Sequence, residues 1–101
     1  ELVKQSTFCD EEHPALLKVN LKQSNGKPSA GVEITITWVD GTENFFTGLK
    51  PELGAGYADF VMTRDVAYAL NISNNGTLLT GLSAPDCGSY PGGILLELSQ
   101  P

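Results

Sequence analysis

The strongest constraint on the fold is a regular alternation of apolar and polar side chains over residues 32–39. Every second side chain from Val32 to Trp38 is apolar, while the intervening positions carry glutamate or threonine. Successive side chains of a β-strand point to opposite faces, so this pattern predicts a strand with one buried face. The turn-forming pairs Asn25-Gly26 and Asp40-Gly41 bracket the segment, as expected for a strand between two chain reversals.

Six further segments show a shorter alternation or a short apolar run, and turn-forming residues separate them. A turn is predicted at residues 74–76, and no segment has a convincing helical period. This rhythm is typical of an all-β sandwich. We predict a single domain over residues 1–101 that forms a seven-stranded, antiparallel-rich β-sandwich. The predicted strands are residues 17–22, 32–39, 42–47, 57–62, 66–72, 77–82 and 93–98.

Length and charge narrow the possible partners. A chain of 101 residues with 41% hydrophobic residues has room for one core. The net charge is −6 and the six lysine and arginine residues are scattered, which disfavours nucleic acid and anionic membrane surfaces. No apolar run is long enough to span a bilayer, so membrane insertion is not predicted. The first residues lack the pattern of a signal peptide, and we expect a domain excised from a larger multidomain protein.

The two cysteines occupy corresponding places near the two ends of the chain. Cys9 precedes the first apolar run and Cys87 precedes the last one. If the strands that follow them lie side by side in the same direction, both sulfur atoms fall at one end of the sandwich. We predict a Cys9–Cys87 disulfide, which in the loop-entropy model contributes roughly 4–5 kcal/mol. It indicates secretion or the cell surface; the alternative is two separate buried thiols in a cytosolic protein.

Three short motifs follow one another along the chain. They are Gly26-Lys27-Pro28-Ser29-Ala30-Gly31-Val32, Gly56-Tyr57-Ala58-Asp59-Phe60 and Tyr68-Ala69-Leu70. Their order resembles that of the prealbumin-like (transthyretin-like, Ig-like) sandwich modules, which include carboxypeptidase-regulatory-like domains and collagen-adhesin B-type repeats. The motifs consist of turn glycines and core positions, so they bear on fold more than on activity. The resemblance implies a structural spacer, stalk or accessory binding module of a bacterial surface or secreted protein.

Some of these adhesin repeats carry an isopeptide bond between a lysine and an asparagine, assisted by a buried acid. The resemblance places Lys18 at a plausible lysine position. However, Asn71 stands where the acid is found in those repeats, and the alternation puts Lys18 on the polar face of its strand. The sequence therefore favours a chain without this crosslink.

The ionisable side chains form no set typical of catalysis or metal binding. His13 is the only histidine, and Cys9, four residues before it, is already assigned to the disulfide. The acidic run Asp10-Glu11-Glu12 lacks the ligand spacing of a calcium loop and is interpreted as a solvated turn. We predict a non-enzymatic domain with no cofactor and no metal. Its expected partners are neighbouring domains or other proteins.

The aromatic residues support a second hypothesis, an accessory carbohydrate-binding module. Trp38 and Tyr68 have core register and are predicted to pack inside. Phe45 and Phe46 are adjacent, so one of the two should point outward. The predicted ligand-contact aromatics are Phe45, Phe46, Tyr57 and Tyr90, and their ligand would be a polysaccharide.

Overall fold

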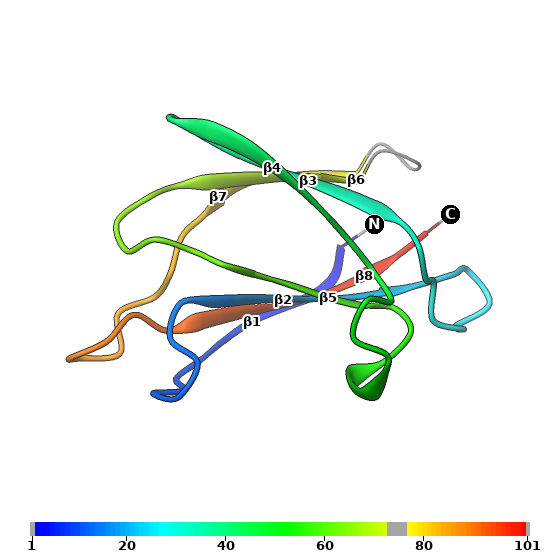
Figure 1. Ribbon diagram of the computed structural model, residues 1–101, viewed down its shortest axis with the longest axis horizontal. Coiled ribbons are helices and arrows are strands. Elements are labelled where there is room, and N and C mark those ends of the chain that lie inside the picture. The colour runs from blue at the N-terminus through cyan, green and yellow to red at the C-terminus, as the bar shows by residue number, and fades with distance from the viewer. Residues whose placement is uncertain (1, 73–76, 101) are drawn as a thin grey trace.

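The computed structural model describes residues 2–72 and 77–100, and the turn predicted at residues 74–76 lies outside them (Figure 1). The described residues form eight strands, and a short 3-10 turn, η1 (Pro51–Leu53), precedes the fifth. The strands are β1 (Leu2–Phe8), β2 (Leu16–Lys22), β3 (Glu33–Trp38), β4 (Gly41–Phe46), β5 (Tyr57–Val61), β6 (Tyr68–Ile72), β7 (Thr77–Leu82) and β8 (Gly93–Ser99).

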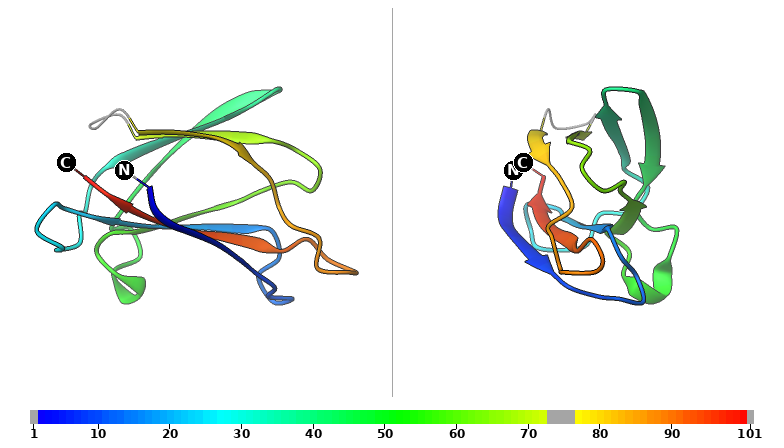
Figure 2. Two further views of the ribbon diagram at one scale, coloured as in Figure 1. Left: turned by 180° about the vertical axis from the view of Figure 1, so that it is seen from behind. Right: turned by 90° about the vertical axis from the view of Figure 1, so that its left-hand side faces the viewer.

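The strands form two four-stranded sheets that face each other (Figures 1 and 2). The first sheet has the order β1-β8-β2-β5 and the second has the order β4-β3-β6-β7. The predicted all-β sandwich is therefore confirmed, but the prediction of seven strands missed one. The missing strand is β1, an edge strand that pairs only with β8 and carries no buried residue. Without a buried face it shows no alternation in the sequence.

Among the eight described strands, every pair is antiparallel except β2 and β8, which run side by side in the same direction from Leu17–Ile94 to Lys22–Ser99. This parallel pair is the arrangement on which the predicted disulfide depended. It brings the residues that precede β2 and β8 to one end of the sandwich.

The core lies between the sheets and is built from the alternating apolar positions of β2, β3, β6 and β8. Leu17, Ile34, Leu70 and Leu96 are each fully buried. Beside these aliphatic residues, Trp38 contacts Tyr68 and Phe60, with ring centroids 5.5 and 5.9 Å apart. Tyr68 is thus buried in the core and Trp38, which is partly buried, packs against it, so both face inward as the strand register predicts.

One glycine marks a close approach of two backbones. The carbonyl oxygen of Gly56 accepts a hydrogen bond of 2.8 Å from the N–H of Leu21, at the start of β5 and the end of β2. A Cβ atom on Gly56 would collide with the carbonyl oxygen of Leu21. A glycine is therefore required before Tyr57 in order for the two strands to meet.

Both ends of the described chain leave the sandwich at the same end (Figure 2). Leu2 is paired with Leu98 at the beginning of the β1–β8 ladder, and Phe8 is paired with Gly93 at the other end of that ladder. The first and last strands therefore form an antiparallel pair whose free ends lie side by side.

Candidate functional site

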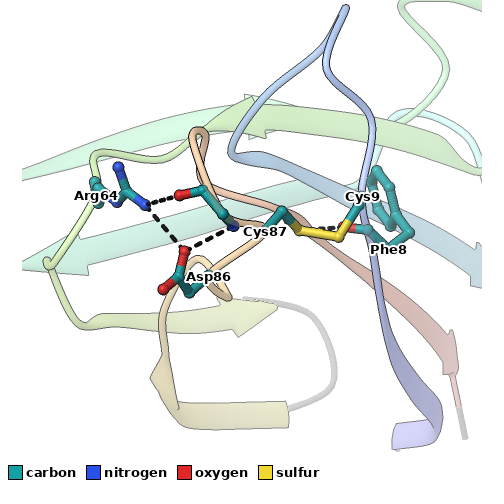
Figure 3. The surroundings of a disulfide bond; sticks show 6 residues. Phe8, Cys9, Arg64, Asp86 and Cys87 are labelled. Atoms are coloured by element: carbon teal, nitrogen blue, oxygen red, sulfur yellow. Dashed lines mark hydrogen bonds and ion pairs between the residues drawn. A yellow bond between two sulfur atoms is a disulfide. The ribbon is translucent and has the colours of Figure 1, made fainter.

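A disulfide closes the end of the sandwich that lies opposite the chain ends (Figure 3). Cys9 and Cys87 are joined, with a Cα–Cα distance of 5.9 Å, and the described cysteines are both in this bridge. The predicted pairing is therefore confirmed. The bridge follows directly on the last residue pair of the β1–β8 ladder, Phe8 with Gly93.

The loop that carries Cys87 is held in place by its own backbone and by one arginine. The N–H of Cys87 donates to the carbonyl of Tyr90 (3.1 Å), and the N–H of Gly92 donates to that of Pro85 (2.6 Å). Arg64 reaches the loop from the connection between β5 and β6 and forms an ion pair of 3.1 Å with Asp86 (Figure 3). The bridge therefore lies in an ordered end of the molecule rather than in a free loop.

The four aromatic residues predicted as ligand contacts are placed differently from one another. Phe46 is 41% exposed, whereas Phe45 turns inward and stacks on Phe60 with ring centroids 5.9 Å apart. Tyr57 is buried. Phe45, Phe46 and Tyr57 nevertheless line one shallow pocket of about 90 Å³. Tyr90 lies in the loop of Cys87 and does not line this pocket. Among the aromatic residues that line the pocket, Phe46 is the well-exposed one.

Three of the side chains that line this pocket, Lys50, Tyr57 and Asp59, form a polar network. Lys50 forms an ion pair with Asp59, with a distance of 2.8 Å from Nζ to Oδ2. The hydroxyl of Tyr57 donates to the same carboxylate oxygen at 2.9 Å. Burial and the hydrogen bond to the Asp59 carboxylate raise the pKa of the Tyr57 phenol well above its ordinary value.

Part of this network had a signal in the sequence. Tyr57 and Asp59 are two positions apart in a strand, so they share a face. Lys50 belongs to the loop before β5, and its approach to Asp59 depends on how that loop folds back over the strand. No local pattern predicts such a contact.

A second hollow, of about 300 Å³, lies next to the network and is lined by side chains of both charges, among them Asp10, His13, Lys18, Lys50 and Asp59. Asp10 lies 3.1 Å from Nδ1 of His13, and this hydrogen bond lowers the pKa of the Asp10 carboxyl below its ordinary value. Asp10 also accepts a hydrogen bond of 3.0 Å from the backbone N–H of Glu12. The acidic run Asp10-Glu11-Glu12 thus forms a locally bonded, exposed turn.

Residues 2–72 and 77–100 contain no group of three or more His, Cys, Asp or Glu side chains that are placed to hold a metal ion. Within the same ranges, no helix has the length and the apolar character that a membrane crossing requires.

Lys18 and Asn71 are not neighbours. Lys18 lies on the polar face of β2, as the alternation predicts, and its Nζ sits 4.7 Å from the centroid of the Phe8 ring. Asn71 is an exposed residue of β6 in the other sheet. The lysine thus makes a cation–π contact with the end of β1.

The sequence matches no family model and no curated protein. The fold, in contrast, is similar to solved structures of the pilus adhesin SpaC from Lactobacillus rhamnosus GG. The open conformation of that adhesin has a TM-score of 0.58 and 15% identity, and covers 87% of this chain and 14% of the adhesin. A C-terminal fragment of it has a TM-score of 0.56 and 14% identity, with 87% of this chain and 45% of the fragment covered. The chain spans less than half of either structure, and at these identities the likeness concerns the fold alone.

Proposed function

We propose that this chain is a non-catalytic structural and protein-interaction module of a secreted or cell-surface bacterial protein. The observation that carries the proposal is a two-sheet sandwich closed at one end by a disulfide, with both chain ends leaving at the other. A disulfide indicates an oxidising compartment. The fold-level likeness to domains of a pilus adhesin agrees with this location.

The position of the chain ends favours a module that stands beside its neighbours. In a linear stalk, the chain enters each domain at one end and leaves it at the other. Here Leu2 and Leu98 are paired, so any segments attached on either side would start next to each other. The sandwich would then project sideways from its parent protein, with the Cys9–Cys87 end farthest from the point of attachment.

We extend the proposal to the fold family, the prealbumin-like sandwiches. The three motifs that carry the resemblance fall in the connection before a strand, at a strand start and within a strand. Residues 26–32 form the turn before β3, residues 56–60 begin with the close approach at Gly56 and continue into β5, and Tyr68-Ala69-Leu70 opens β6. Two sheets of four strands support the same assignment.

Accessory carbohydrate binding is the second candidate, and one specific observation favours it. Phe46 is exposed at the rim of the shallow pocket that Phe45 and Tyr57 also line. An exposed aromatic face beside hydrogen-bonding groups, here those of Lys50 and Asp59, is a suitable contact for the apolar face of a sugar ring. A single exposed ring offers less stacking surface than a platform of several rings.

A thermal-shift and pull-down panel against soluble and insoluble polysaccharides tests the two candidates. A ligand present at 100 times its dissociation constant stabilises the folded state by about 2.7 kcal/mol, which is readily measured. The structural proposal expects no shift with any polysaccharide. The carbohydrate proposal expects a shift that Phe46→Ala abolishes and that Leu78→Ala, a change of an exposed apolar residue on β7, leaves intact. Binding that survives Phe46→Ala would contradict both.

A further inference from the structure

The disulfide and the two chain ends lie at opposite ends of the same pair of strands. β1 and β8 are antiparallel and pair from Leu2–Leu98 to Phe8–Gly93. The Cys9–Cys87 bridge follows immediately after the last of these pairs. A continuous path therefore leads from one chain end along β1, across the bridge and back along β8 to the other chain end.

The two strands of this path respond differently to tension applied between the chain ends. Because the free ends of β1 and β8 lie side by side, pulling them apart loads the ladder one residue pair at a time from Leu2–Leu98 onward. β1 is an edge strand without a buried residue, so few side-chain contacts oppose its removal. β8 lies between β1 and β2 and buries Ile94, Leu96 and Leu98.

Once β1 has detached, the bridge receives the load. Tension then passes from Cys9 to Cys87 and along β8, which already has the extended geometry of a strand. A pull along its own axis does not require β8 to leave the sheet. The residues between the two cysteines, which are 78 positions apart, receive no tension through the backbone.

We propose that the Cys9–Cys87 bridge is a mechanical lock, which confines extension of the module under tension to the short segments outside the bridge and keeps β2 to β7 out of the load path. The proposal rests on the structural role proposed above, and it applies where segments attached to the two neighbouring chain ends pull them apart. It goes beyond that role because it assigns the bridge a task other than thermodynamic stability.

The lock sets a definite limit on how far the chain can extend. A fully extended chain spans about 3.4 Å per residue. Residues 1–9 and 87–101, which lie outside the bridge, then extend to about 80 Å, whereas the whole chain of 101 residues extends to about 340 Å. Opening the bridge is therefore expected to increase the greatest extension about fourfold.

The experiment is a constant-force measurement on the full chain, held by handle domains fused to its two ends. The oxidised protein is expected to lengthen to no more than about 80 Å. Addition of dithiothreitol should then produce a delayed step of about 260 Å, at a rate that rises with thiol concentration. In that step a thiolate attacks one sulfur of the bridge, forms a mixed disulfide with it and releases the other cysteine as a thiolate. Oxidised dithiothreitol, which has no free thiol, is the matched control.

Two variants separate the lock from the stability of the core. Leu96→Ala weakens the core but retains the bridge, so its oxidised form should keep the limit of about 80 Å. The double variant Cys9→Ser/Cys87→Ser should reach about 340 Å without any thiol. If the double variant does not fold, the thiol-dependent step of the unaltered protein still decides the question.

An oxidised chain that lengthens well beyond 80 Å, or one that shows no thiol-dependent step, would overturn the lock. Either result would leave the structural role standing, because an extensible module can still hold neighbouring domains in position. A polysaccharide hit abolished by Phe46→Ala would instead remove the structural role without affecting the lengths measured under force.

Discussion

Strands β1 and β8 are hydrogen-bonded neighbours along six residue pairs, yet they differ in almost every other respect. β8 lies between two strands and contributes Ile94, Leu96 and Leu98 to the core. β1 has a neighbour on one side only, and Val3 is 63% exposed. A backbone hydrogen bond contributes about 1 kcal/mol net, while burial of a large aliphatic side chain contributes about 1.5–3 kcal/mol. Pairing therefore places β1 in the sheet without making it part of the core.

The largest effect is expected from the bridge that ties the end of β1 to the start of β8. The loop-entropy model gives roughly 4.5 kcal/mol for a closed loop of this size, as an upper figure. Cys9→Ser/Cys87→Ser should lower the free energy of unfolding by up to this amount, measured by urea denaturation against the oxidised protein. A loss well below 1 kcal/mol would mean that the bridge does not restrict the unfolded chain.

The second largest effect is a difference in stability between substitutions in the two strands at one residue pair, Gln5 with Leu96. Leu96 is fully buried, so Leu96→Ala should lower the free energy of unfolding by about 3 kcal/mol through lost burial and an unfilled cavity. Gln5→Ala on the exposed edge strand should change it by less than about 0.5 kcal/mol. Urea denaturation measures both variants, and similar losses at the two positions would contradict the contrast between the strands.

The other edge of the same sheet, β5, sharpens the comparison because it is anchored by side chains. The raised pKa of Tyr57 means that the folded state keeps the phenolic proton when the unfolded chain, with a pKa of 10.0, has lost it. The contribution of the protonated Tyr57 phenol to the free energy of unfolding is complete below pH 10. Above pH 10 it decreases by about 1.4 kcal/mol for each pH unit.

Tyr57→Phe removes the ionisable phenol, so the free energy of unfolding of this variant should fall less steeply above pH 10. At neutral pH the variant should be less stable, because it loses the hydrogen bond to Asp59. Urea denaturation between pH 9 and about 11.5 compares the two slopes over the range in which the unfolded phenol ionises. Equal slopes would show that Tyr57 titrates alike in both states.

The smallest effect concerns how firmly β1 is held in the native protein. Its backbone amides should exchange with solvent faster than those of β8, since an edge strand with exposed side chains opens at little cost in free energy. Hydrogen exchange measured by NMR checks this difference in protection. For the same reason, Val3→Thr in β1 should leave the midpoint of thermal unfolding almost unchanged. Protection of β1 equal to that of β8 would show that the two strands open only together.

The contrast also explains which parts of the molecule were predictable from sequence. Strands with one buried face, such as β2 and β3, show the alternation that burial imposes on side chains. β1 has no such face, so residues 2–8 carry no comparable signal. The ligand-contact hypothesis shows the same limit. Residue type makes Tyr57 a candidate ligand contact, whereas its burial is set by the tertiary structure.

All-β class and core register follow from the sequence, because side-chain periodicity and turn chemistry are local properties of the chain. With two cysteines in the sequence, Cys9 and Cys87 allow one pairing within the chain, although the parallel β2–β8 pair brings them together. The edge position of β1, the exposure of Phe46 beside an inward-facing Phe45 and the contact of Lys50 with Asp59 depend on which strands and loops meet. So does the placement of both chain ends opposite the bridge. These features arise from contacts between residues far apart in the chain, whose free energy no local pattern records.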